Sequence, residues 1–302
     1  MASIARSTIR AGRFRRVVWT GWAATHDHWQ SNWTQQDIAR MIAGTRSDFE
    51  VLPVLRREIP AGARVLEAGC GLGQWVIVLR ELGIKAFGVD YVADALRTSV
   101  RHRSAPSVVT CGDINRLPFA DGTFEAITSF GVVEHFWRGP AALIAEMVRV
   151  LAPGGTMFLS VPYFNALRKM TLARAPQSVY DADEEPAAFY QFAFERQEIA
   201  EAVEKAGLVI TDSFGVGPVK GWKDEIGLFA ALRGRLNQST APSSLEAPAA
   251  AQVPRSGGGS RGGLSLARTL RRTLQVLANT RLSAAVAGHM IMLVCKKPEG
   301  AV

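Results

Sequence analysis

The stretch Arg64-Val-Leu-Glu-Ala-Gly-Cys-Gly-Leu-Gly-Gln-Trp75 decides the fold of this chain. The two residues after Arg64 are apolar and glycines follow soon after, which predicts a buried strand that runs into a tight turn. The backbone can turn sharply, and a ligand can lie against it, at three alternating glycines: Gly69, Gly71 and Gly73. The apolar pattern of residues 75–82 predicts a helix whose N-terminal N–H groups face the same ligand.

The spacing of these glycines separates two classes of nucleotide ligand. A dinucleotide-binding Gly-x-Gly-x-x-Gly motif that starts at Gly69 would need a glycine where the chain has Gln74. A start at Gly71 also fails, because Val76 stands in place of the third glycine. A nicotinamide-dependent dehydrogenase is therefore disfavoured. For this stretch alone, a strand, turn and helix without a ligand stays open as an alternative.

Strand and helix patterns alternate after the loop, which predicts an α/β fold with a parallel sheet. We expect strands at residues 85–89, 108–111, 124–130 and 156–161, and helices at residues 91–103 and 140–151. Asp90 ends the second strand about 20 residues after the loop, where a carboxylate can accept hydrogen bonds from both hydroxyls of a ribose. The pattern thus favours a nucleoside ligand.

Four segments resemble, in order and spacing, the motifs of class I S-adenosylmethionine (SAM)-dependent methyltransferases: residues 65–73, 87–90, 111–127 and 151–156. A fifth, Val133-Glu134-His135-Phe136, is similar to a segment of the small-molecule members, the methyltransferase type 11 group. The resemblance covers residues 60–217 and a last strand near residues 289–296. It implies a Rossmann-like, seven-stranded, mostly parallel sheet with an antiparallel last strand, helices on both faces, and SAM as cofactor.

The resemblance also implies which residues bind SAM: Glu67, Gly69, Gly71, Gly73, Asp90, Tyr91, Asp113, Ile114 and Phe130. Glu67, the glycines and the backbone near Phe130 would hold the methionine part, and Asp90 the ribose. Asp113 would accept a hydrogen bond from the adenine amino group, with the Ile114 N–H reaching the ring. The structural alternatives are that Asp113 caps a turn before Asn115 and that Asp90 caps the helix after it.

The acceptor side has one candidate catalytic residue, His135. It follows a strand's carboxyl end, and its ordinary pKa suits proton abstraction near neutral pH. A structural histidine at a helix start is the alternative. Tyr163 and Tyr190 are weaker candidates for acceptor contacts. The chain lacks an Asn/Asp-Pro-Pro-Tyr/Phe run after the fourth strand, which argues against enzymes that methylate amino groups of bases or glutamine. No metal site is predicted.

Three regions are expected along the chain: a basic flexible tail at 1–16, a helical cover at 17–60 and the methyltransferase domain at 61–302. The cover holds four tryptophans and a predicted helix from Asp37 to Leu55, which Pro53 breaks. The domain ends with a helix at 189–207 and strands at 208–216 and 289–295. The first 24 residues contain no acid and also resemble a mitochondrial presequence in composition.

Residues 218–287 are predicted to be an insertion between the last two strands that acts as a lid over the acceptor. Within it, residues 237–263 are rich in Ser, Pro, Ala and Gly and are expected to be disordered. Residues 264–278 have the pattern of a basic amphipathic helix, which can contact a membrane surface. These expectations concern the acceptor and not the cofactor, because the insertion lies outside all four SAM motifs.

The formal charge of +8 is carried by the two ends. Residues 1–16 contribute +5 and residues 255–302 contribute +7, so residues 17–254 carry −4. This distribution disfavours nucleic acid as the acceptor. Three scattered cysteines fit reduced thiols in the cytoplasm, with peripheral membrane contact as an option. We expect methyl transfer from SAM to a small molecule, lipid or glycan. The alternative is a catalytically silent SAM-binding or membrane-associated partner protein, and the oligomeric state stays open.

Overall fold

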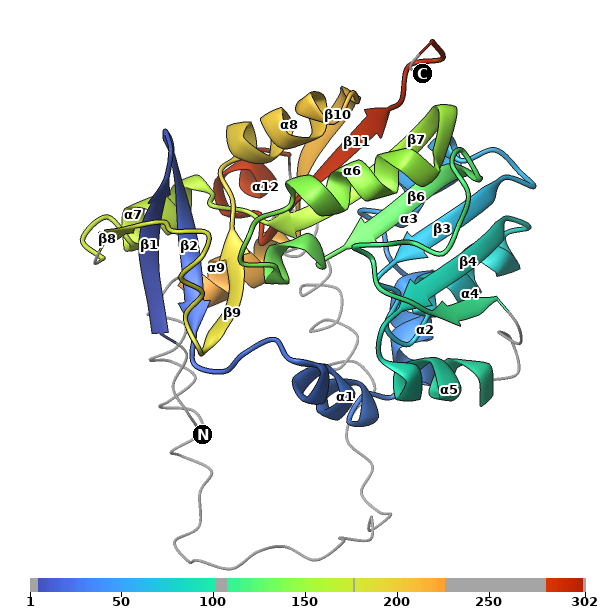
Figure 1. The fold of residues 1–302 in the computed structure, drawn as a ribbon, viewed down its shortest axis with the longest axis horizontal. Coiled ribbons are helices and arrows are strands. Elements are labelled where there is room, and N and C mark those ends of the chain that lie inside the picture. Colours follow the sequence, from blue (N-terminus) through green and yellow to red (C-terminus); the bar gives the residue numbers. More distant parts are fainter. Residues whose placement is uncertain (1–4, 102–107, 176, 226–280, 301–302) are drawn as a thin grey trace, which may run out of the picture.

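The computed structural model describes residues 5–101, 108–175, 177–225 and 281–300. Seven strands form the larger of its two sheets (Figure 1): β3 (Arg64–Ala68), β4 (Lys85–Asp90), β5 (Val109–Cys111), β6 (Phe124–Phe130), β7 (Leu151–Pro162), β10 (Val209–Val216) and β11 (Met290–Lys296). Their order is β10-β11-β7-β6-β3-β4-β5. Strand β11 runs antiparallel to β7 and β10, and the pairs among β3–β7 are parallel. The predicted fold class is confirmed.

The strand order fixes where a ligand can bind. Strand β3 has β4 on one side and β6 on the other, so the order reverses at β3. Ligands of open α/β sheets bind outside the carboxyl ends of the strands at such a reversal. Strand β3 is apolar because both faces are covered: neighbouring Val65 and Leu66 face opposite sides and are both fully buried. The glycine-rich loop leaves β3 at this point.

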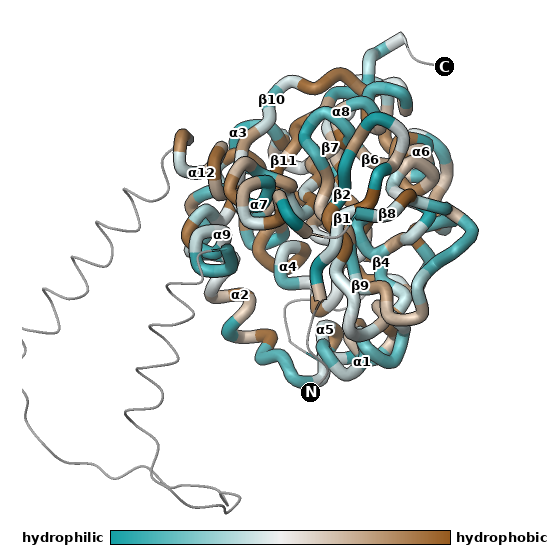
Figure 2. The backbone as a smooth tube through the Cα atoms, turned by 90° about the vertical axis from the view of Figure 1, so that its left-hand side faces the viewer, coloured by the Kyte–Doolittle hydropathy of each residue, from teal (hydrophilic) through white to brown (hydrophobic). Residues whose placement is uncertain are grey.

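Helices cover both faces of the sheet: α2 (Ile38–Arg46), α3 (Leu52–Glu58), α4 (Gln74–Glu81), α5 (Ala93–Arg101), α6 (Ala141–Val150) and α8 (Arg196–Lys205). Leu66 packs in one cluster with residues of α6 and α8, such as Leu143 and Ile199. Val65 packs in another cluster with Leu55 of α3 and residues of α4. Figure 2 shows hydrophobic stretches along the central strands and hydrophilic ones on outer helices.

A second sheet of four strands was not predicted. It consists of β1 (Ala5–Ala11), β2 (Phe14–Thr20), β8 (Gln177–Val179) and β9 (Phe189–Ala193), in the order β8-β1-β2-β9. Strands β1 and β2 form an antiparallel hairpin whose turn is Gly12 and Arg13. Strand β2 pairs with β9, with Val17 opposite Ala193. This sheet stands beside the carboxyl ends of the larger one (Figure 1).

The expectation of a flexible tail at residues 1–16 was wrong for residues 5–16. Ile9 is buried in the main core cluster, which holds β1 in place. Three of the arginines that suggested a solvated tail instead make ion pairs with glutamates of α8 and of a later helix, α9 (Pro218–Glu225): Arg6 with Glu225, Arg13 with Glu201 and Arg16 with Glu198. Charge composition alone does not reveal such partners, because they lie 182–219 residues away in the chain.

Two predicted helices also differ from the structure. Residues 189–193 form β9, and α8 begins only at Arg196, because the aromatic side chains of the strand are buried against the second sheet. The helix predicted from Asp37 to Leu55 is two helices, α2 and α3. The Asp48 carboxylate accepts hydrogen bonds from the N–H groups of Val51 and Leu52 and so starts α3. Pro53 lies in the first turn of α3, where proline is tolerated, and breaks nothing.

Most of the predicted insertion, including residues 237–263 and 264–278, lies outside the described residues. Its described ends are α9 and α12 (Arg281–Ala287), which contact each other. Glu225, the last residue of α9, is buried and accepts hydrogen bonds from Arg6, Arg168 and Thr171. Arg168 and Thr171 belong to α7 (Ala166–Thr171). None of the helices described is long and apolar enough to cross a bilayer.

Candidate functional site

The loop between β3 and α4 can be built only with glycines. Gly69, Gly71 and Gly73 have φ angles of 80°, 52° and 72°, in the left-handed region that favours glycine. A Cβ atom at residue 69 would lie 2.6 Å from Val132 Cγ2, and one at residue 73 would lie 2.9 Å from Ser99 Oγ. The loop backbone is therefore packed from outside on several sides, which fixes the direction of its N–H groups.

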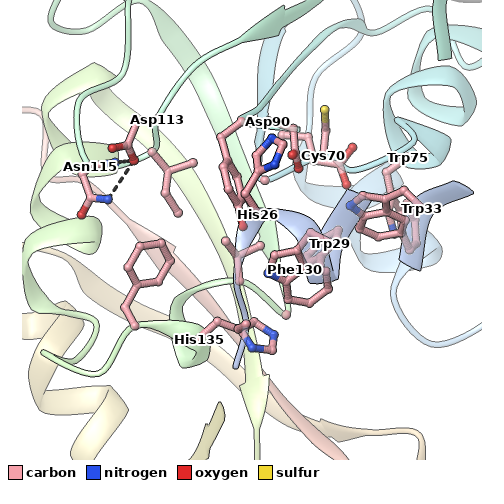
Figure 3. Close-up of a pocket in the computed structure, with 18 of the residues that line it drawn as sticks. His26, Trp29, Trp33, Cys70, Trp75, Asp90, Asp113, Asn115, Phe130 and His135 are labelled. Carbon is pink, nitrogen blue, oxygen red and sulfur yellow. Dashed lines mark hydrogen bonds between the residues drawn. The ribbon is translucent and has the colours of Figure 1, made fainter. Parts of the chain in front are cut away.

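A cavity of about 560 Å³ opens beside this loop at the carboxyl ends of β3, β4 and β6 (Figure 3). Two further elements close it: α1 (His26–Thr34), and a short 3₁₀ helix, η1 (Val133–His135). Eight of the ten predicted site residues line the cavity: Glu67, Gly69, Asp90, Tyr91, Asp113, Ile114, Phe130 and His135. Gly71 and Gly73 shape the loop behind it. The fold thus brings residues from four strand ends to one place.

Asp90 combines a structural and a ligand-facing position. Its Oδ2 accepts a hydrogen bond from the Gly71 N–H (2.8 Å) and its Oδ1 accepts one from the Val92 N–H (2.9 Å). Burial raises the pKa of this carboxyl, against the effect of these backbone bonds. Each carboxylate oxygen can accept a second hydrogen bond, so Asp90 still has capacity for the two hydroxyls of a ribose. It therefore both braces the glycine loop and faces the cavity.

Glu67 is buried beside the loop with an unsatisfied oxygen. Its side chain is 3% exposed, and its Oε2 has no hydrogen-bond partner among the described residues. Burial places the pKa of the carboxyl well above its usual range, against a hydrogen bond from the backbone of Val76. A buried acceptor without a partner is costly, and a ligand donor can satisfy it. The ammonium group of SAM is such a donor, so this residue fits the implied cofactor.

The far end of the cavity is formed by the segment after β5. Asp113 Oδ1 accepts hydrogen bonds from the backbone N–H and side-chain amide of Asn115. Asp113 therefore caps the turn before Asn115, as the structural alternative predicted. It also lines the cavity. Ile114 is buried beneath the turn. Across from it, burial together with the charges of Asp90 and Asp113 raises the pKa of Tyr91 to about 12. Asp113, Ile114 and Tyr91 all line this end of the cavity, where the resemblance would place the adenine.

The opposite end of the cavity is walled by aromatic rings. Trp29 and Trp33 of α1 stack at a centroid distance of 6.0 Å, and the edge of Trp29 meets His135 at 4.8 Å. Tyr190 of β9 lies 5.0 Å from the His135 ring. Figure 3 shows His135 and Trp29 on the side of the cavity away from Asp113. The second sheet therefore contributes, through Tyr190, to the environment of the proposed acceptor residue.

His135 is held as a neutral imidazole with a defined tautomer. Its Nδ1 lies 2.7 Å from the carbonyl oxygen of Tyr190. A carbonyl only accepts, so Nδ1 carries the hydrogen and Nε2 presents a lone pair. Burial lowers the pKa of His135 to about 4, against the hydrogen bond to Tyr190. The side chain is therefore uncharged near neutral pH, with Nε2 available as a proton acceptor.

The charges around the cavity are of one sign. Glu67, Asp90 and Asp113 line it, and no lysine or arginine is found among the described residues of its lining. SAM carries a sulfonium and an ammonium group, so the carboxylates suit the cofactor. The same part of the chain contains no cluster of three or more metal-ligating side chains. An anionic second ligand would find no cationic side chain in this wall.

Several residues of the site escaped the sequence analysis. Trp29, Trp33, Cys70, Gln74, Trp75 and Asn115 all line the cavity. The tryptophans were noticed as part of a cover, but no spacing rule shows which of them faces a ligand. Tyr163 does not reach this cavity and instead lines a separate one of about 370 Å³ between α3, β10 and α12. Its role in acceptor contact stays a prediction, which this position does not support.

Comparison with known proteins agrees with this geometry. Residues 66–159 match a family model described as a methyltransferase domain. A probable S-adenosylmethionine-dependent methyltransferase of Mycolicibacterium smegmatis is 31% identical over 156 residues, 52% of this chain and 56% of that protein. A probable tRNA methyltransferase 9B of Mus musculus is 37% identical over 102 residues, 33% of this chain and 22% of that protein. A ubiquinone biosynthesis O-methyltransferase of Methylococcus capsulatus is 34% identical over 104 residues, 33% of this chain and 44% of that protein.

The chain thus spans about half the length, or less, of these curated relatives. Among solved structures, the complex between the Haloferax volcanii Trm112 methyltransferase activator and a methyltransferase contains a similar chain. The TM-score is 0.52 at 17% identity, over 89% of this chain and 97% of that one. At this identity the likeness shows the fold alone. The matched segment contains the glycine loop, Asp90, Asp113 and His135, so residues 66–159 carry a domain similar to those of SAM-dependent methyltransferases.

Proposed function

We propose that this protein transfers a methyl group from SAM to a small, uncharged acceptor: a small molecule, a lipid or a glycan. One observation carries the proposal. The cavity has an acidic end, built by Glu67, Asp90 and Asp113, and an aromatic end around Trp29 and His135, with no lysine or arginine in its described lining. The first end suits a cationic cofactor. The second suits an apolar or aromatic group and gives no cationic partner to a phosphate or carboxylate.

A nucleic-acid acceptor is less well supported. Proteins that hold RNA or DNA neutralise phosphates with lysine and arginine. Three of the N-terminal arginines, Arg6, Arg13 and Arg16, are already paired with glutamates. The relative named as a tRNA methyltransferase matches over only 22% of its own length, so the match does not carry that protein's acceptor. The type of acceptor therefore rests on the cavity itself.

The residues divide the work as follows. Bound SAM supplies an electrophilic methyl group, whose carbon takes the acceptor's electron pair while the C–S bond breaks and its electrons return to sulfur. Glu67 and the glycine loop would hold the methionine part, and Asp90 the ribose. His135 Nε2 would take the proton that the acceptor releases. Trp29 and the ring of His135 would exclude water and hold the acceptor in line, which is the main protein contribution to such a displacement.

The test uses the full chain with methyl-labelled SAM and a cell extract separated into soluble small molecules and glycans, lipids, and RNA with protein. Label in the first or second fraction is expected. Label in RNA would contradict the proposed acceptor class. SAM binding without label in any fraction would favour the silent SAM-binding or membrane-associated partner. An Asp90→Ala variant, which should not bind SAM well, controls for transfer by contaminating enzymes.

A further inference from the structure

Glu134 is a buried carboxyl side chain that lies outside the cofactor cavity. It lies in η1, is 2% exposed and has no hydrogen-bond partner for its Oε2 in the part of the chain that the structure describes. It does not line the cavity, so bound SAM cannot satisfy it as it could satisfy Glu67. A buried carboxyl with an unsatisfied oxygen costs stability. A residue kept at this cost is a candidate for a role in the reaction.

Glu134 lies beside the proposed proton acceptor, His135. Glu134 Oε1 lies 3.9 Å from His135 Nε2, the ring nitrogen that carries the lone pair. The same oxygen lies beside Gly131, where an added Cβ would be 3.3 Å from it. Two other titratable groups face the pair: Tyr190 from β9, whose pKa the Glu134 charge raises, and His28 from α1.

We propose that Glu134 and His135 act as one proton-accepting unit, in which His135 Nε2 takes the acceptor's proton and the Glu134 carboxylate balances the charge. This inference rests on the proposed function. A lone pair of the acceptor atom forms the bond to the methyl carbon, and the C–S bond breaks with its electrons returning to sulfur. The acceptor's bond to hydrogen breaks as well; its electrons stay on the acceptor atom and the proton goes to His135 Nε2. The positive charge of the sulfonium thereby moves to the imidazole. Glu134 is a positioning and charge-balancing residue, since it does not touch the cavity.

Electrostatics support this division of roles. Burial lowers the pKa of His135 to about 4, which makes it a poor base by itself. With the effective dielectric constant of about 20 that describes protein sites, two unit charges about 4 Å apart can change such a pKa by about 3. An ionised Glu134 would therefore bring the imidazole back to a useful basicity. Burial raises the pKa of Glu134 to about 8, so the pair becomes competent as the pH rises through that value.

The test needs no acceptor. The full chain is labelled with ¹⁵N-histidine, and the His135 signals are assigned by their loss in His135→Asn. The expected result for the unmodified protein is a titration step of His135 Nε2 near pH 8. Glu134→Gln should abolish this step, leave only the step near pH 4, and leave SAM affinity unchanged. The same step in Glu134→Gln as in the unmodified protein would overturn the proposal.

A control variant tests whether the loss of the His135 titration step is specific to Glu134 or follows from removing any buried carboxyl group. Glu198 of α8 is 8% exposed and also has an oxygen without a hydrogen-bond partner among the described residues, but it pairs with Arg16 of β2. Glu198→Gln should leave the His135 titration as it is, and a loss of the pH 8 step in that variant would count against the pair. If the unmodified protein did not bind SAM, the proposed function would be overturned. The titration would still show whether Glu134 and His135 are coupled.

Discussion

The indole ring of Trp33 packs directly against the backbone of Gly71. A Cβ atom at residue 71 would lie 2.5 Å from Trp33 Cζ2. Helix α1 therefore rests on the loop that would hold the cofactor, and it also supplies Trp29 to the aromatic end of the cavity. Helix α1 thus connects the glycine loop with the aromatic end of the cavity. A change in the loop is thus expected to reach the acceptor end.

Gly71→Ala should lower SAM affinity more than tenfold, because the methyl group meets Trp33 and the residue keeps a φ of 52°. Gly62→Ala is the matched control: its φ is 77°, but nothing lies within 4 Å of the added Cβ. Calorimetric titration with SAM measures both variants. Trp33→Ala in the Gly71→Ala background should restore part of the affinity. Equal affinities of Gly71→Ala and Gly62→Ala would show that the contact with Trp33 is unimportant.

Asp90→Ala should lower SAM affinity by more than tenfold, since two charge-assisted hydrogen bonds of roughly 1.5–3 kcal/mol each are lost. From the sequence alone, the damage to cofactor binding is expected to be far larger than the damage to folding. The structure changes that expectation, because the N–H groups of Gly71 and Val92 lose their acceptor, and a stability loss of about 1–3 kcal/mol follows. Calorimetry and urea unfolding measure the two effects. A folded variant with undiminished SAM affinity would contradict the ribose assignment.

His135→Ala should lower methyl transfer by about 10²–10⁴-fold while SAM affinity stays nearly unchanged. The reason is that His135 lies at the aromatic end of the cavity, on the side away from Asp113. Label incorporation into the active extract fraction measures the rate, and calorimetry measures the affinity. If the variant transfers methyl groups at the original rate, His135 is a structural residue that holds Tyr190.

Glu134→Gln should make the protein more stable at alkaline pH. The folded state keeps a proton on Glu134 up to a pKa of about 8, whereas the unfolded chain releases it near 4.3. The folded state therefore binds more protons between these values, and the stability of the unmodified protein falls as pH rises, by up to about 1.4 kcal/mol per pH unit. Glu134→Gln has no carboxyl group to deprotonate at this position, so its stability does not fall with pH for this reason. Urea unfolding at pH 5 and pH 8 should show its advantage growing by several kcal/mol, and a constant difference would contradict the shifted pKa.

Glu225→Ala should destabilise the protein by about 3–5 kcal/mol, because the buried guanidinium of Arg168 loses its carboxylate partner. Asp224→Ala is the control, since the neighbouring Asp224 side chain is 37% exposed and its pairs with Lys220 and His289 are partly solvated. Thermal or urea unfolding measures both. Equal, small effects would mean that α9 can be removed together with the insertion in which the sequence placed it.

The sequence by itself determined the larger sheet and the cofactor end of the site. The glycines of residues 69–73, the acid at the end of β4 and the alternation of short apolar runs with helical patterns are local signals. Their meaning does not depend on distant residues, because a turn with positive φ or a strand buried on both faces imposes its own residue types. Asp113 and Ile114 were assigned to the adenine through the resemblance to the SAM-dependent methyltransferases.

Only the tertiary structure decided the second sheet and the aromatic end. Strand β2 pairs with β9 about 175 residues later, so the hairpin at residues 5–20 looks like a basic tail until its partners are known. The same holds for Glu134 and His135. Neighbouring residues in the sequence reveal neither the burial of the carboxyl nor the carbonyl of Tyr190 that fixes the imidazole tautomer. Burial and hydrogen bonding arise from chain segments far apart, and these set the proton affinity of the site.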